Sequence, residues 1–169
     1  HSFGGIYEKY AAICNGAVLS LESGFGKNID TLIENWKIIK PTVFFSVPRI
    51  YQAIATKLRQ HPELDSEIFH DELRFIFTAA APLPKNISDM FENRNIPVYE
   101  GWGLTETSPC CTVTDPNVKR QMGVVGKPIP GISLKLSDEG EILVRGPNVM
   151  TGYYNNIEET TKVLPNDGW

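Results

Sequence analysis

A short stretch that follows an apolar run holds the residues best suited to chemistry. In the segment 101–106, "GWGLTE", two glycines allow a ligand to approach the main chain closely. The ring of Trp102 between them offers a flat face on which a purine could stack. Thr105 has a hydroxyl that can donate to a phosphate oxygen, and Glu106 has a hard oxygen ligand for Mg²⁺. The segment predicts a nucleotide site, although a glycine-rich turn without a ligand has the same pattern.

The chain before this segment alternates between helical and strand patterns. Apolar residues at helical spacing predict helices around Tyr10, Trp36, Ile54 and Phe91. Strands that alternate with such helices indicate an α/β fold with a mostly parallel sheet and flanking helices. Ligands bind such sheets at the carboxyl ends of the strands. The four predicted strands, two of them directly followed by polar or small-residue segments, are 17–21, 42–46, 74–78 and 96–99.

The character of the sequence changes near Asp115, where a polar, turn-rich segment begins. We therefore expect an α/β unit at 1–116 and the start of a small β-rich unit at 117–169. Alternating apolar residues on both sides of the turn 138–140 predict a β-hairpin. Further on, Asn156 has the residue type and spacing of a helix cap, with Glu159 three residues later.

Composition excludes several classes of function. The 169 residues are 41% hydrophobic and 21% charged, as in ordinary globular proteins. The net charge of −4 and the lack of Lys or Arg runs argue against nucleic acid or an anionic membrane as partner. No apolar stretch approaches the ~20 residues of a membrane span. The three cysteines, Cys14, Cys110 and Cys111, fit neither a disulfide framework nor a zinc site, which favours a reduced, cytoplasmic protein.

Five motifs in order make the whole chain resemble the adenylate-forming superfamily, which includes acyl-CoA synthetases, luciferases and adenylation domains. They are "HSFGG", "FTAAAPLP", "YEGWGLTETS", "GVVGKPIPGISLKL" and "GEILVRGPNVMTGYYNNIEETTKVLPNDGW". A further segment, "SVPRIYQAI", resembles the long-chain fatty acyl-CoA synthetase branch, although the helical stretch after it is shorter than is usual there. The resemblance implies the second subdomain of the N-terminal domain of such an enzyme.

The resemblance also implies a two-step reaction with ATP, Mg²⁺ and coenzyme A. A fatty acid carboxylate attacks the α-phosphate of ATP to give acyl-adenylate and pyrophosphate, and the thiol of coenzyme A then takes the acyl group and releases AMP. Thr105 would hold a phosphate and Glu106 would ligate Mg²⁺, so these two are the implied catalytic residues. The implied adenine pocket contains Ala79, Ala80, Gly101, Trp102 and Thr105, and the implied acyl pocket contains His1, Phe3, Gly103, Thr107 and Ser108.

Departures from the family pattern limit this interpretation. Ala79 and Ala80 stand where paired glycines are common, and their methyl groups would narrow the pocket. The phosphate loop ending in Pro-Lys, the Thr-Gly-Asp motif and the C-terminal domain with its lysine are not found. We therefore expect an internal piece of a longer ligase, inactive and self-associating when isolated. The longer protein is expected to be cytoplasmic, with peripheral membrane contact left open.

Two other interpretations remain open at this point. One is an adenylation domain that activates aryl or amino acids. The other is a non-catalytic, degenerate adenylate-binding module.

Overall fold

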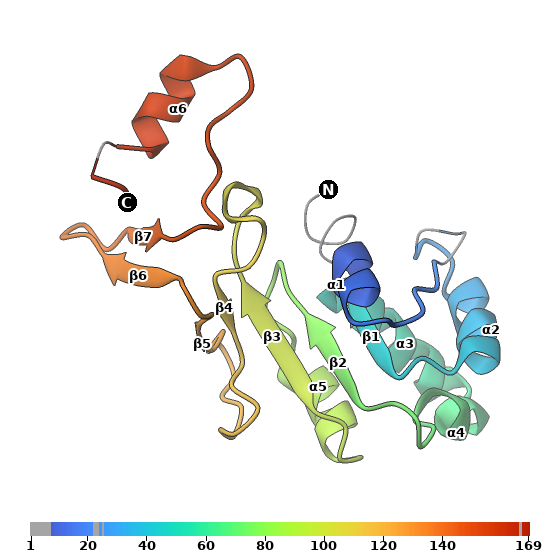
Figure 1. Ribbon diagram of the computed structural model, residues 1–169. Helices are drawn as coiled ribbons and strands as arrows, with labels where there is room; N and C mark the ends of the chain where they lie inside the picture. The colour runs from blue at the N-terminus through green and yellow to red at the C-terminus, as the bar shows by residue number, and fades with distance from the viewer. Residues whose placement is uncertain (1–7, 22–23, 25, 166) are drawn as a thin grey trace.

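The computed structural model describes residues 8–21, 24, 26–165 and 167–169 of the chain. Figure 1 shows a sheet with helices at the N-terminal side and a smaller hairpin with one helix at the C-terminal side. The helices are α1 (Glu8–Cys14), α2 (Ile29–Ile39), α3 (Pro48–Gln60), α4 (Asp65–Ile68), α5 (Lys85–Glu92) and α6 (Ile157–Val163), with 3₁₀ turns η2 (Pro62–Leu64) and η3 (Thr105–Thr107). The strands are β1 (Val43–Ser46), β2 (Phe75–Thr78), β3 (Val98–Trp102), β4 (Thr112–Val113), β5 (Lys127–Pro128), β6 (Ser133–Leu136) and β7 (Ile142–Arg145).

The larger sheet has the order β1-β2-β3-β4-β5. Strands β1, β2 and β3 are parallel, so their carboxyl ends meet at one edge of the sheet. Strands β4 and β5 continue the sheet in the antiparallel sense. The predicted α/β fold with a mostly parallel sheet is confirmed.

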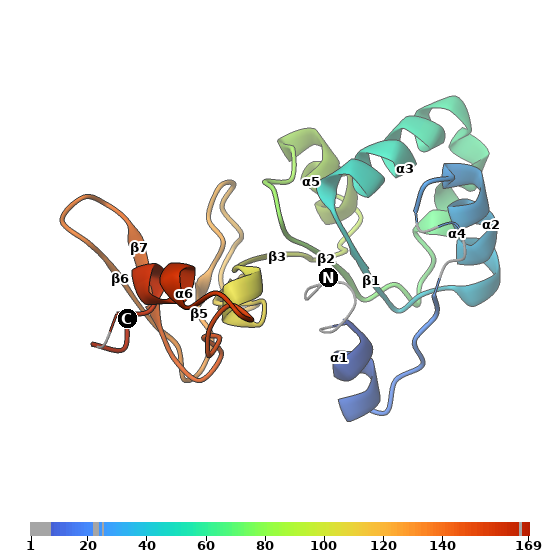
Figure 2. The same ribbon diagram turned by 90° about the horizontal axis from the view of Figure 1, so that it is seen from above.

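The core lies between this sheet and the helices α2 to α5, which cover one of its faces, while α1 lies on the other side (Figure 2). Phe44 and Ile76 are paired in register, and both contribute to this core. Tyr51 of α3 is fully buried, and its hydroxyl lies 3.0 Å from the Phe44 carbonyl oxygen and 2.7 Å from that of Phe77. Burial raises the pKa of this phenol well above its ordinary value. Helix α3 is thereby fixed to the sheet by packing and by hydrogen bonding.

Local sequence signals explain where the helices begin and end. The Asn28 side chain accepts hydrogen bonds from the backbone of Asp30 and Thr31 and caps α2. Pro48 occupies the first turn of α3, where a missing N–H group costs no helical hydrogen bond. α5 begins directly after Pro84 and contains Phe91 of the predicted helix. The predicted helices are therefore confirmed in the described part of the chain.

Two strand predictions need correction. The segment 17–21 was predicted as a strand but pairs with no strand in the described part of the chain, and its Val18 is 94% exposed. An apolar run forms a strand only when another strand satisfies its backbone groups. The strand predicted at 96–99 begins and ends later, at Val98–Trp102. Gly101 and Trp102 of the segment 101–106 are therefore part of the sheet.

The C-terminal part agrees with the sequence patterns. β6 and β7 form the predicted hairpin, with Leu134 opposite Val144, and the turn contains Gly140 at a φ of 83°. The Asn156 side chain caps α6 by accepting from the backbone N–H of Glu159. None of the helices in the described part of the chain has the length and apolar character needed to span a bilayer.

Candidate functional site

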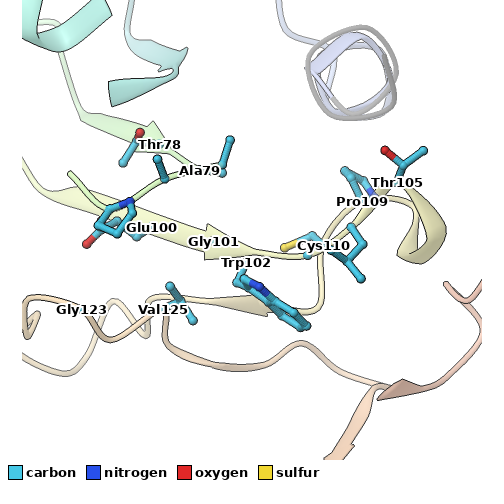
Figure 3. A pocket seen from close by; sticks show the side chains of 15 residues that line it. Thr78, Ala79, Glu100, Gly101, Trp102, Thr105, Pro109, Cys110, Gly123 and Val125 are labelled. Carbon is cyan, nitrogen blue, oxygen red and sulfur yellow. The ribbon is translucent and has the colours of Figure 1, made fainter. Parts of the chain in front are cut away.

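A cavity of about 460 Å³ opens at the carboxyl ends of β2 and β3. Figure 3 shows side chains from the two strands, from the loops that follow them and from a later loop around the same space. Its position is the one at which parallel sheets bind ligands. The lining residues are Thr78, Ala79, Ala80, Ala81, Pro82, Glu100, Gly101, Trp102, Gly103, Leu104, Thr105, Pro109, Cys110, Gly123 and Val125.

Close packing against a side chain at Gly101 and against the backbone at Gly103 explains the two glycines beside Trp102. A Cβ atom on Gly101 would lie 2.7 Å from Cζ of Phe77, and one on Gly103 would lie only 1.9 Å from the carbonyl oxygen of Pro109. The chain therefore crosses itself at Gly103, and the half-buried indole of Trp102 is left at the cavity wall. At both glycines, the space that a side chain would need is taken by other atoms of the chain, so the glycines permit this close packing.

The 3₁₀ turn after β3 is held in place by a distant segment of the chain. The Asn148 side-chain amide donates to the carbonyl oxygens of Thr107 at 2.8 Å and Cys110 at 3.0 Å. The backbone N–H of Met150 donates to the carbonyl oxygen of Glu106 at 2.8 Å. Within the turn, the backbone N–H of Leu104 donates to the Thr107 hydroxyl at 2.9 Å. These bonds define the position of the turn relative to the cavity.

Glu106 points its carboxylate at a tyrosine from the C-terminal segment. The hydroxyl of Tyr153 donates to Oε1 of Glu106 at 2.8 Å. This hydrogen bond, and secondarily burial and the negative charge of Glu106, raise the pKa of the Tyr153 phenol above its ordinary value. The contact orients a carboxylate beside the cavity, and a carboxylate oxygen is the type of ligand that Mg²⁺ prefers.

The described residues hold no group of three or more His, Cys, Asp or Glu side chains arranged as a metal site. Mg²⁺ usually takes one or two protein carboxylates and completes its shell with waters and substrate phosphates. The single carboxylate of Glu106 therefore fits a metal that is bound together with a nucleotide. It does not fit a metal held by protein groups alone.

Glu100 is the charged residue in the wall of the cavity. It is 6% exposed, its Oε1 accepts from the backbone N–H of Leu83 at 3.2 Å, and its Oε2 accepts from Nε of Arg120 at 2.7 Å. The two side chains of this ion pair are 7% and 9% exposed. A buried carboxylate is tolerated because these partners compensate its lost hydration.

The two adjacent cysteines are structural. Cys111 is fully buried, and Cys110, which lines the cavity, is 9% exposed. Burial raises the pKa of the Cys110 thiol, so the reactive thiolate is disfavoured there. Both cysteines are therefore packing residues in or beside the cavity wall.

All five predicted nucleotide residues line the same cavity, but the predicted acyl residues do not all reach it. Thr107 is buried within the 3₁₀ turn, Ser108 is exposed, and neither lines the cavity; Glu106 also lies outside its wall. His1 and Phe3 lie outside the described residues. The residues that the structure does bring together are Ala79, Ala80, Gly101, Trp102, Gly103 and Thr105.

Sequence reasoning assigned no role to Glu100, Arg120, Asn148 or Tyr153. A signal existed for Glu100, because a lone carboxylate within an apolar strand requires a buried partner. Its partner Arg120 lies twenty positions further along the chain. Asn148 and Tyr153 act over 41 and 47 positions. Such contacts are set by the tertiary fold, which no local pattern encodes.

Two known proteins show what the chain is similar to in sequence. It is 28% identical over 190 residues to the long-chain-fatty-acid–CoA ligase FadD15 of Mycobacterium bovis. This match covers 86% of this chain and 31% of that protein. It is 32% identical over 169 residues to a feruloyl-CoA synthase of an Amycolatopsis species, covering 93% of this chain and 33% of that protein. The chain thus spans about a third of the length of these relatives.

A solved structure supports the fold independently. The O-succinylbenzoate coenzyme A synthetase of Bacillus subtilis, in complex with AMP, superposes with a TM-score of 0.75 at 20% identity. The match covers 98% of this chain and 34% of that one. At this identity the comparison establishes the fold alone. The family assignment comes from the sequence profile of the AMP-binding enzymes, which matches residues 1–154, and the chain accordingly belongs to the AMP-binding enzyme family.

Proposed function

We propose that the chain carries the adenine-binding and metal-binding side of the active site of an AMP-forming acyl-CoA ligase. One observation carries this proposal above the others. The residues that the family resemblance assigns to adenine, Ala79, Ala80, Gly101 and Trp102, line one cavity at the carboxyl ends of β2 and β3. Family membership and the ligases among the relatives support the same activity.

The reaction needs positioning more than acid–base chemistry. A carboxylate substrate is already a nucleophile, so the protein must align it with the α-phosphate of ATP and compensate the charge that develops there. Thr105 is proposed to donate its hydroxyl to a phosphate oxygen. Glu106, oriented by the Tyr153 hydroxyl, is proposed to hold Mg²⁺, which would neutralise phosphate charge when bound. The thiol of coenzyme A then displaces AMP from the acyl-adenylate.

The proposed substrate is a fatty acid, and a longer-chain acid is favoured by the segment 46–54, "SVPRIYQAI". A second candidate is an aryl acid, because a feruloyl-CoA synthase is 32% identical over nearly the whole chain. The third interpretation, a non-catalytic module, has no specific support, because the departures at Ala79 and Ala80 concern the width of the pocket.

The test uses the full-length ligase that we propose contains this chain, because the chain spans about a third of the length of its relatives. The protein is incubated with ATP, Mg²⁺, coenzyme A and acids from acetate to palmitate, with ferulate in parallel, and AMP release is measured. AMP release with fatty acids supports the proposal, and release with ferulate alone supports the aryl interpretation. A protein that binds ATP but releases no AMP with any of these acids is a non-catalytic module.

The isolated 169-residue chain is proposed to be inactive and to self-associate. Parallel sheets are normally covered on both faces. Here the stacked Phe45 and Phe77 alternate along β1 and β2 with the core residues Phe44 and Ile76, so their rings lie on the face opposite the α2–α5 core. Acyl-adenylate formation by the isolated chain, at a rate abolished by Glu106→Gln, would contradict the first expectation. A monomer at micromolar concentration in size measurements would contradict the second.

A further inference from the structure

The buried ion pair between Glu100 and Arg120 connects the two sides of the cavity. Glu100 lies on β3 in the cavity wall, and it is not among the residues that the family resemblance assigned. A carboxylate that is 6% exposed in an apolar strand is costly, and a pair of well-packed apolar residues of similar volume would often serve stability equally well. Its presence at the cavity wall therefore calls for an explanation beyond packing.

One oxygen of Glu100 holds the first wall. Oε1 accepts from the backbone N–H of Leu83 at 3.2 Å, and Leu83 is itself buried. The four residues before it, 79–82, line the cavity. The carboxylate therefore anchors the end of the loop that follows β2.

The other oxygen holds the opposite wall. Oε2 accepts from Nε of Arg120, which lies in the loop between β4 and β5. Nη1 of Arg120 lies 3.5 Å from Oε1 of Glu92 at the end of α5, so the guanidinium also contacts the helical layer. Gly123 and Val125, a few residues further on, line the cavity.

The backbone of Glu100 is fixed as well, so the carboxylate starts from a rigid position. Its N–H donates to the Thr114 hydroxyl at 2.9 Å, and its carbonyl oxygen accepts from the backbone N–H of Thr114 at 2.9 Å. A side chain on such a fixed strand residue can hold two loops at a defined separation.

We propose that Glu100 and Arg120 are a positioning pair that sets the separation of the loops 79–83 and 115–126 and thereby the affinity of the cavity for its ligand. The identity of that ligand as an adenine nucleotide rests on the proposed function, whereas the positioning of the loops does not. Both oxygens of Glu100 are engaged by Leu83 and Arg120, so we expect the pair to act on affinity through the positions of the loops.

Measurements of both the stability and the ligand affinity of variants distinguish this positioning role from a merely structural one. Arg120→Met leaves an unpaired buried carboxylate and should be strongly destabilising. The double variant Glu100→Gln/Arg120→Met removes both charges and retains an acceptor oxygen for Leu83, so most of the stability should return. Both variants lack the hydrogen bond from Arg120 to Glu100 that anchors the loop 115–126. A structural role predicts that affinity returns together with stability, and a positioning role predicts that it does not.

The matched control breaks another ion pair of the same loop. Nζ of Lys127 lies 3.0 Å from Oδ2 of Asp115, but the Lys127 side chain is 71% exposed. Exposed pairs contribute little. Lys127→Met should therefore leave the loop and the cavity unchanged.

The experiment uses the 169-residue chain with two readouts, amide hydrogen exchange without ligand and the affinity for AMP. The amides of Val118 and Val124 report on the loop, because they donate to the carbonyl oxygens of Asp115 and Gln121 within it. In the folded double variant these amides should exchange about tenfold faster, and AMP should bind about tenfold more weakly, as expected for the loss of one charged hydrogen bond. Lys127→Met should match the wild type in both readouts.

Wild-type exchange at Val118 and Val124 in the folded double variant would overturn the proposal. If the wild-type chain binds no AMP, the proposed function fails, and the exchange result still decides the positioning role. If the double variant does not fold, Arg120→Lys decides, because it keeps the charge and loses the Nε donor. Faster exchange in Arg120→Lys supports the proposal, and unchanged exchange overturns it.

Discussion

Gly103→Ala is expected to displace the turn that borders the cavity. The added Cβ would lie 1.9 Å from the carbonyl oxygen of Pro109, 2.7 Å from its carbonyl carbon and 2.9 Å from Cα of Cys110. All three are backbone atoms, so no side-chain rotation can relieve the overlap. The backbone must move by roughly 1.5 Å to reach ordinary van der Waals contact, which begins near 3.5 Å.

The surrounding hydrogen bonds resist that movement. Asn148 donates to the carbonyl oxygens of Thr107 and Cys110 on either side of Pro109, and the backbone N–H of Cys111 donates to the Trp102 carbonyl oxygen at 2.8 Å. Overpacking alone costs about 1–3 kcal/mol. The loss of one of these bonds adds about 1 kcal/mol. We expect Gly103→Ala to lower the free energy of unfolding by about 3 kcal/mol, or the melting temperature by about 6–12 °C.

Gly123→Ala is the matched control, because Gly123 also lines the cavity. A Cβ atom there would meet no atom within 4 Å, and the residue has a φ of 80°. The cost should be only the backbone strain of about 1 kcal/mol. Urea unfolding followed by circular dichroism measures both variants. Equal losses of stability in Gly103→Ala and Gly123→Ala would refute the close crossing of the chain at Gly103.

Three further predictions follow from single residues. Ala80 has a φ of 75°, so Ala80→Gly should raise the free energy of unfolding by about 0.5–1 kcal/mol, whereas Ala79→Gly should lower it; the opposite order in urea unfolding would contradict the strained conformation. Glu106→Gln should lower the pKa of the Tyr153 phenol towards its ordinary value, measured from the pH dependence of its ring NMR signals, and an unchanged pKa would exclude the hydrogen bond. Burial raises the pKa of Glu8 from 4.5 to about 7, because the buried carboxyl group favours its protonated form. The contribution of this group to stability is fully present below about pH 4.5 and is lost as the pH rises through about 7. Glu8→Gln should therefore be more stable than the wild type at pH 8 and gain nothing at pH 4, and a gain that is independent of pH would contradict the shift.

Local patterns in the sequence sufficed for the helices and for most strands. Pro48 and Asn156 mark helix starts through their own backbone and side-chain chemistry, so these signals do not depend on distant residues. The segment 17–21 shows the limit of this approach. It has the apolar character of a strand, but pairing depends on a neighbouring strand that local sequence cannot identify.

The candidate site shows the same limit more clearly. Trp102 was predicted at the site from the residue types of the segment 101–106 and Ala79 from the family resemblance, and both line the cavity. The partners that hold the site in place were not predicted. Asn148 and Tyr153 reach the turn after β3 from the C-terminal segment, and these contacts arise only when the chain has folded.

An NMR titration of the isotope-labelled 169-residue chain with AMP tests the central claim most directly, because it asks whether the cavity at the ends of β2 and β3 binds an adenine nucleotide. We predict saturable shifts confined to the amides of the cavity wall, at 79–81, 101–105, 123 and 125. Amides in the β6–β7 hairpin should not shift. The absence of shifts at millimolar AMP, or shifts centred on the hairpin, would contradict the claim.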